Sequence, residues 1–343
     1  MRLSRIALPA GSVVLFAAAA VLSFSIEPGL HKVPSDQDST SNYVGTATLL
    51  NAPAIATGDI QNLFLKDLPV KASQRMKAVK TSGSTVVLQE TDILTGPDGK
   101  DLQNSQYTYA VDSKTLAGRP APAGTKATTI QGSLGPEVTP KKSGYQMWDS
   151  TTQQAFPATY VRTEKREGRT TYVYNSKGTA PVKDPTTLAS MPQSLPKTAL
   201  KLVAAALPAD QQKLLAGALP QLPDPLPLTY LNTLDVTLWV DAATGNTLDT
   251  TKDQTIVAAM PGASAPTPLA AVTSVKIKVA PEQVKKNAAA AADDAKALTL
   301  IGTVIPIALT VVGLALLALA FWLPRRRRGA TPEETPVEET ATV

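Results

Sequence analysis

Two long apolar runs stand near the ends of the chain, with a segment of mixed polarity between them. Residues 6–26 and 297–324 contain no Asp, Glu, Lys or Arg. A helix rises about 1.5 Å per residue, so about 20 apolar residues cross the hydrocarbon of a bilayer. We therefore predict one transmembrane helix over 6–26 and another over 298–324.

The first apolar run has an alternative interpretation as a cleaved signal peptide. Ser23 and Ser25 form a poor small-x-small cleavage site. The run is also longer than the apolar core of a signal peptide, which has about 7–15 residues. A retained anchor is favoured, and the cleaved peptide stays open as the alternative.

Cationic residues flank both apolar runs on their outer sides. The second run ends with Phe321 and Trp322, and an arginine cluster follows at 325–328. Interfacial aromatics followed by cations are typical of the cytoplasmic edge of a spanning helix. We therefore predict cytoplasmic segments at 1–5 and 325–343, the latter basic and then disordered. The topology determinants are Arg2, Arg5, Arg325, Arg326, Arg327 and Arg328.

Alternating apolar and polar positions recur through residues 27–280, which the topology places outside the cytoplasmic membrane. Each of three strand pairs flanks a loop that contains Gly, a residue that tolerates left-handed backbone angles. The paired ranges are 84–94 with 106–111, 158–164 with 169–174, and 234–241 with 247–257. With further strands at 43–50 and 272–279, the pattern predicts a mainly antiparallel sheet, barrel-like or sandwich-like.

Two segments of this region depart from the strand pattern. Residues 197–219 are rich in Ala and Leu at helical spacing, which predicts a helical insert interrupted at Pro208. The insert is expected to pack on the sheet; a mobile cap, or a surface for lipid or a partner, is the alternative. Residues 281–297 are Ala-rich and begin with Pro281, which predicts a helical stalk before the second span.

Composition removes several classes of function. The chain has no Cys and a single His, His31. Disulfides, thiolate metal sites and a His-based catalytic triad within one chain are therefore excluded. The net charge is +5, but six of the 33 basic residues flank the apolar runs and four of the 28 acidic residues lie in the tail. The remaining +3 is a mixed surface that does not indicate nucleic-acid binding.

Candidate chemistry is sparse. Nucleophile elbows, phosphate-binding loops and metal-ligand spacings are absent, so we predict a non-enzymatic protein without cofactor or metal. The carboxylates Glu164 and Glu167 flank a hairpin tip beside cations and indicate surface pairing. Asp241, followed by Thr244 and Gly245, predicts a turn in which Asp accepts backbone N–H groups; calcium is the weaker alternative.

The most distinctive local segment is YQMWD at 145–149. An aromatic pair of this kind either lines a ligand pocket or belongs to the core. The core is favoured, because a buried indole usually donates its N–H to a backbone carbonyl. Trp148 and Tyr145 are the candidate pocket or core residues.

The chain resembles an actinobacterial family of membrane proteins of unknown function grouped under the porin PorA name. The resemblance rests on both apolar ends, YVGTATL at 43–49, YQMWD leading to FPA at 156–158, and WVDAATG at 239–245. It covers nearly the whole chain, but each motif alone is weak. It implies an actinobacterial cell envelope and carries over no functional residue.

A porin barrel fits the strand pattern poorly. Each strand of such a barrel needs a lipid-facing apolar row, whereas the tip of the 158–174 hairpin carries six charged residues. The first hypothesis is therefore an external domain that binds or transfers a hydrophobic envelope component. An oligomeric channel and an accessory subunit of an envelope complex are the alternatives. Expected partners are membrane lipid, a hydrophobic ligand, and an envelope protein or second copy.

Overall fold

The computed structural model describes residues 3–23, 31–51, 54, 57–205, 212–213, 217, 219–262 and 266–322. Two units divide the chain. One comprises residues 31–293, and the other combines residues 1–30 with 294–343. We call the first the β unit and the second the helical unit, and each is described by itself.

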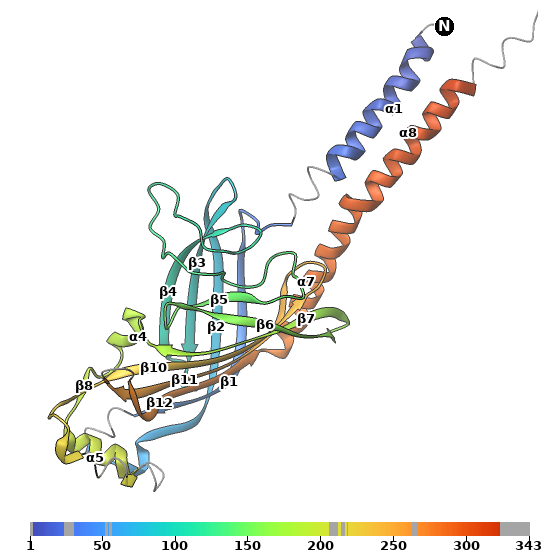
Figure 1. Cartoon of the computed structure of the whole chain (residues 1–343). Coiled ribbons are helices and arrows are strands. Elements are labelled where there is room, and N and C mark those ends of the chain that lie inside the picture. The colour runs from blue at the N-terminus through green and yellow to red at the C-terminus, as the bar shows by residue number, and fades with distance from the viewer. Residues whose placement is uncertain are drawn as a thin grey trace, which may run out of the picture. The chain divides into compact units, whose positions relative to one another are not determined.

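The β unit is built on one sheet of ten antiparallel strands (Figure 1). Its order is β4-β3-β2-β1-β12-β11-β10-β7-β6-β5, so most neighbours in the sheet are also neighbours in sequence. The strands are β1 (Asp38–Leu50), β2 (Phe64–Ser82), β3 (Thr85–Thr95), β4 (Asp101–Asp112), β5 (Tyr145–Asp149), β6 (Gln154–Arg166), β7 (Arg169–Pro181), β10 (Thr229–Asp241), β11 (Thr247–Met260) and β12 (Thr267–Val279).

Seven of the eight ranges predicted as strands lie within these strands, and the eighth, 84–94, begins one residue before β3. The prediction of a mainly antiparallel sheet is confirmed. The predicted hairpin tips are also observed. Glu167 and Gly168 both have positive φ, at 46° and 76°, in the two-residue loop between β6 and β7. This is the geometry that joins two twisted strands tightly.

The sheet is curled, and a connecting segment lies against its two edge strands. Residues 113–144 bridge to β4 through Thr128 and Gly118, and to β5 through Ser133. Both backbone groups of Ser133 are hydrogen-bonded to β5. Its carbonyl accepts the N–H of Trp148 at 2.8 Å, and its N–H donates to the Gln146 carbonyl at 2.7 Å. Backbone groups that an open edge would leave unpaired are thus satisfied at these positions.

Short elements cover one end of the β unit. They are the helix α4 (Pro185–Ala189), the helix α5 (Lys197–Ala205), the two-residue strands β8 (Ser194–Leu195) and β9 (Leu226–Pro227), and the turns η2 (Ile60–Asn62) and η3 (Leu219–Gln221). Leu63, Leu195, Leu200 and Leu226 form a buried apolar cluster there. The predicted helical insert is therefore small: α5 accounts for its first nine residues, and most of 206–218 lies outside the described part of the chain.

A helix of 42 residues, Pro281–Trp322, contains the predicted stalk and the second apolar run as far as Trp322; residues 323 and 324 of the run lie outside the described residues. It comprises α7 (Pro281–Thr299), a π-helical segment η4 (Leu300–Val304) and α8 (Ile305–Trp322). The π segment ends two residues before Pro306, which lacks the N–H that a regular helix would need. Within the β unit, Ala288 and Ala291 of α7 pack on Leu248.

One helix among the described residues, rather than the two predicted, is long and apolar enough by itself to cross a membrane. The N-terminal helix α1 spans Leu3–Val21, and its described apolar part, Ser12–Val21, is shorter than a membrane span. Within the helical unit α1 packs against α8, where a Cβ on Gly313 would lie 2.9 Å from the Phe16 ring. Residues 24–26 of the predicted first span lie outside the described residues.

Candidate functional site

The curled sheet lines a partly open cavity of about 370 Å³. Successive side chains of a strand point to opposite faces of a sheet. Every second residue of the strands therefore forms a row on the inner face, and all ten strands contribute to the lining. We call this space the interior cavity.

Two aliphatic rows line one part of the interior cavity. Alternate residues of β10 and β12 supply them: Leu234, Val236 and Leu238 on β10, and Val275, Ile277 and Val279 on β12. Between these rows β11 contributes Thr250, Lys252, Gln254 and Ile256, and Lys252 pairs with both Val236 and Ile277. Each aliphatic row favours contact with hydrocarbon, and the mainly polar row of β11 separates the two.

A polar wall lies on β1, β2 and β3, which continue the sheet beyond β12. The Tyr43 hydroxyl donates to Gln74 Oε1 at 3.3 Å, and Gln74 Nε2 donates to Glu90 Oε1 at 2.5 Å. Asp92 follows Glu90 on the same face of β3. Glu90 is only 9% exposed. We call Tyr43, Gln74, Glu90 and Asp92 the polar wall.

Burial opposes ionisation of the carboxyl groups of the polar wall. Burial raises the pKa of Glu90 above its usual range, and the charge of Asp92 raises it further; the charge of Lys252 and the hydrogen bond from Gln74 oppose both effects. Burial also raises the pKa of Asp92, against the charge of Lys252. Lys252 is the one Lys or Arg in the lining among described residues.

Three buried polar atoms that face the interior cavity have no hydrogen-bond partner within the described chain: Asp92 Oδ1, the Tyr109 hydroxyl and Trp148 Nε1. Tyr109 is 1% exposed. A buried polar group without a partner costs about 1–3 kcal/mol, so such groups are normally satisfied. Because all three atoms face the interior cavity, polar atoms of a ligand would find hydrogen-bond partners there.

A second polar network closes the cavity beside β10 and β11, and it is internally satisfied. Asp149 accepts hydrogen bonds from Thr152 N at 3.0 Å and from Asn232 Nδ2 at 3.3 Å. Gln254 Nε2 donates to Asn232 Oδ1 at 3.0 Å and to Thr151 Oγ1 at 3.2 Å. Because its groups pair with one another, this network serves the packing of the cavity floor.

The two aromatic residues singled out in the sequence have different surroundings. Trp148 lines the interior cavity and packs against the buried cluster that contains Tyr109. Tyr145 makes an edge-to-face contact with Tyr174, with 5.3 Å between ring centroids, and its hydroxyl accepts the Lys141 N–H at 2.8 Å. Of the topology determinants, Arg2 and the 325–328 cluster lie outside the described residues, and so does the side chain of Arg5.

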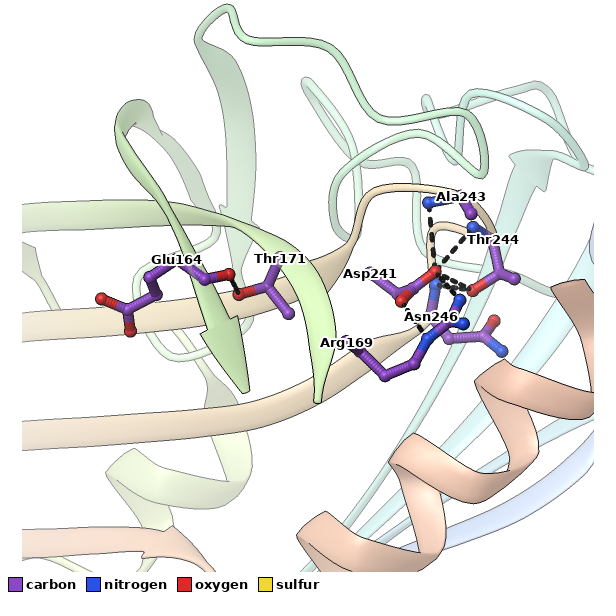
Figure 2. Close-up of polar contacts among 7 residues, drawn as sticks. All are labelled: Glu164, Arg169, Thr171, Asp241, Ala243, Thr244 and Asn246. Carbon is purple, nitrogen blue, oxygen red and sulfur yellow. Dashed lines mark hydrogen bonds and ion pairs between the residues drawn. The ribbon is translucent and has the colours of Figure 1, made fainter. Parts of the chain in front are cut away.

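The turn predicted at Asp241 is observed between β10 and β11 (Figure 2). Asp241 Oδ1 accepts the N–H groups of Ala243 and Thr244 at 3.1 and 3.0 Å, and Gly245 has φ 75°. Arg169 also binds both carboxylate oxygens, at 2.8 and 2.9 Å. These donors occupy the carboxylate that a calcium ion would need. No group of three or more His, Cys, Asp or Glu side chains suited to a metal occurs among the described residues.

The acidic pair of the polar wall was not recognised in the sequence, although a signal was present. Glu90 and Asp92 alternate with the same period as the buried residues Val86 and Leu88 on β3. Acidic residues on the buried face of a predicted strand are uncommon unless they are paired. Lys252 carried no such signal, because its partners lie on other strands.

The fold and the cavity define a small curled-sheet protein with a lined interior and a long apolar helix. The family model of porin PorA matches residues 3–322, and the chain belongs to this family. Together with the 42-residue apolar helix, the family assignment makes this a membrane-associated protein. No curated protein matches the chain.

Several solved structures are similar at low levels. An acyl-CoA hydrolase from Agrobacterium tumefaciens is 7% identical, with 73% of this chain and 98% of that chain covered and a TM-score of 0.17. A MaoC domain protein described as a dehydratase, from Chloroflexus aurantiacus, is 10% identical, with 80% and 90% covered and a TM-score of 0.15. The peroxisomal multifunctional enzyme type 2 of Drosophila melanogaster is 11% identical, with 74% and 40% covered and a TM-score of 0.14. These scores are too low to establish a shared fold.

Proposed function

We propose that this chain is a non-enzymatic, membrane-anchored protein of the actinobacterial cell envelope, and that its β unit binds or transfers a hydrophobic envelope component. The observation that carries the proposal is the interior cavity, with aliphatic rows on β10 and β12 and a polar wall on β1, β2 and β3. Its volume of about 370 Å³ lies within the range of small-molecule pockets, about 300–1,000 Å³.

The division of the lining favours an amphipathic ligand over a purely polar one. An alkyl chain along Val236 and Ile277 gains about 0.8 kcal/mol for each buried CH₂ group. Buried polar atoms of Asp92, Tyr109 and Trp148 in the same cavity need hydrogen-bond partners. A molecule with an apolar chain and a polar head meets both demands.

Membrane anchoring is proposed through the helical unit. Phe16 packs over Gly313, which is the close contact with a small residue that is common between helices in lipid. The other faces of both helices are exposed and apolar, as at Val14 and Val311, which are 65% and 59% exposed. With the flanking arginines, this pairing supports a two-pass topology with both termini in the cytoplasm.

An oligomeric channel is the second candidate, because of the family name. The outer face of the sheet opposes a version in which the sheet itself crosses the bilayer. Lys276 and Asp253 lie on it, with side chains 67% and 46% exposed, and Lys278 is exposed beside them. Charged rows of this kind are costly against lipid. Conductance of the purified chain in planar bilayers would favour the channel.

The third candidate is an accessory subunit that binds an envelope protein or a second copy of the chain. No nucleic-acid partner is proposed, because exposed cations such as Lys177 and Lys276 pair with acids. Crosslinking in intact cells tests this candidate: one reproducible partner would support it. Enzymatic activity is not proposed, since the chain has one His and no Cys.

Two matched variants test binding in the cavity. Val275→Trp places a large ring in the interior cavity, whereas Ser274→Trp places it on the outer face of the same strand. Lipid extraction and mass spectrometry of the purified proteins should recover an amphiphile from the natural chain and from Ser274→Trp, and several-fold less from Val275→Trp. Equal recovery from all three, each showing a cooperative thermal transition, would overturn the proposal.

A further inference from the structure

We propose that the polar side of the interior cavity selects a neutral head group that carries hydroxyl groups, such as a sugar or another polyol. The inference rests on the proposed function, because it names the chemistry of the head on the amphiphile proposed above. It starts from the unpartnered atoms at Asp92, Tyr109 and Trp148.

These atoms require both a donor and an acceptor from the ligand. Trp148 Nε1 is a donor only, and an ionised Asp92 Oδ1 is an acceptor only, while the Tyr109 hydroxyl can act as either. A hydroxyl group both donates and accepts, so a head with several hydroxyls serves all three. A quaternary ammonium supplies no acceptor for the indole, and a phosphate diester supplies no donor for the carboxylate.

The charges of the lining also disfavour an ionic head. An anionic head would meet the carboxyl groups of Glu90 and Asp92, and a cationic head would meet Lys252. Because acids and a cation share the same lining, neither ionic head meets a lining of uniformly opposite charge that would compensate for its dehydration. A neutral head needs no such compensation.

The three atoms lie on neighbouring parts of the lining. Trp148 packs against the cluster formed by Tyr109 and Leu88, and Tyr109 pairs with Leu88 across β3 and β4. Glu90 is two residues further along β3 and pairs with Tyr107. The head group is therefore expected between β3, β4 and β5, and the chain along β10 and β12.

The test compares three amphiphiles that share an octyl chain and differ in the head: octyl glucoside, octyl phosphate and octyltrimethylammonium. Each is titrated calorimetrically, below its micelle concentration, into the full chain in phosphatidylcholine nanodiscs. The Val275→Trp variant provides the baseline for partition into lipid. We expect the glucoside to bind about 10-fold or more tightly than either ionic amphiphile.

Conservative variants locate the selectivity. Trp148→Phe removes the indole donor, and Asp92→Asn exchanges one carboxylate oxygen for an amide NH₂ group and removes the charge. Each should weaken glucoside binding about 10-fold, because the head group loses a buried donor in the first variant and a charged acceptor in the second. Asp253→Asn is the matched carboxylate on the outer face, exposed and paired with Lys276, and should leave binding unchanged.

Three outcomes would contradict the account, and they differ. Heats identical to those of Val275→Trp for all three amphiphiles would overturn binding in the cavity, and the head-group inference with it. Equal binding of all three, or preference for an ionic head, would overturn only the head-group inference. A glucoside preference that Trp148→Phe and Asp92→Asn leave unchanged would overturn its assignment to this side of the cavity.

Discussion

Glu90 and Asp92 are two acidic residues placed on the inner face of a strand, where a sheet protein usually carries aliphatic side chains. They are held there by Gln74 and by the charge of Lys252 across the cavity. Burying carboxyl groups in this way opposes folding whenever they are ionised. Residues retained against such a cost are candidates for function.

The raised pKa of Glu90 predicts a pH-dependent loss of stability. The contribution of Glu90 is fully present below its unfolded pKa of about 4.5 and is lost as the pH rises through the higher folded pKa. Glu90→Gln should therefore stabilise the chain by about 1–3 kcal/mol at pH 9 and have little effect at pH 4. Chemical denaturation at both pH values measures this; Glu282→Gln, on the exposed face of α7, is the control. A variant that is equally or less stable than the natural chain at pH 9 would contradict the account.

Gly45 on β1 is required for a different reason, which is the close approach of β12. An added Cβ would lie 1.9 Å from the Lys276 carbonyl oxygen, a backbone atom that cannot move alone. Gly45→Ala should cost about 1–3 kcal/mol in unfolding free energy. Gly217→Ala is the comparison, because nothing lies within 4 Å of its Cβ position. Similar stabilities of the two variants would show that β1 and β12 separate more easily than their contact indicates.

At the scale of elements, the hairpin between β10 and β11 was predictable because its turn is local. Asp241, Thr244 and Gly245 are close in sequence, and each has the conformational preference that the turn uses. The bond from Arg169 was not predictable, because 72 residues separate it from Asp241.

We expect loss of the buried ion pair at the Asp241 turn to lower the free energy of unfolding much more than loss of an exposed ion pair. Asp241 is 1% exposed and carries the Arg169 guanidinium and three local donors. Asp241→Ala should destabilise the chain by about 3–5 kcal/mol, because it leaves buried donors and a cation unpaired. Asp253→Ala, at an exposed pair on β11, should cost less than about 1 kcal/mol. Equilibrium unfolding of both variants measures the difference, and comparable losses would contradict the buried pairing.

Two strands of the ten-stranded sheet were missed, and their sequences explain why. β2 contains Pro69 and several cations, and its inner row includes Gln74 where an aliphatic residue would give a clear alternation. β5 has only five residues, so a period of two cannot be established within it. In both cases tertiary pairing decides the structure over local preference.

The pairing of α1 with α8 also lay beyond sequence reasoning, since two apolar runs give no indication of register. It can be tested directly because the chain has no Cys. A Phe16→Cys/Gly313→Cys pair should be joined by a short bifunctional thiol reagent in membranes. Val14→Cys/Gly313→Cys should not be joined, because Val14 is 65% exposed on another face of the helix. Equal crosslinking of both pairs would contradict the observed packing.

At the scale of the whole molecule, the sequence predicted a β-rich domain with apolar helices at the chain ends, and the described residues contain both. The interior cavity could not be predicted, because it depends on which rows of ten strands face one another. The membrane topology remains a prediction from the arginine flanks. Labelling of single engineered cysteines near residues 3 and 340 from the cytoplasmic side only would support it, and labelling of either from outside would contradict it.

The most direct test of the account is to map where an amphiphile binds. An alkyl glucoside with a photoreactive diazirine in its chain is added to the full-length protein in nanodiscs, irradiated, and located by peptide mass spectrometry. We predict modified residues on the inner rows of β10 and β12, above all Val236, Leu238 and Ile277, and their loss in Val275→Trp. Modification confined to α1 and α8, with none on the β unit, would show that the amphiphile meets this protein only in the membrane.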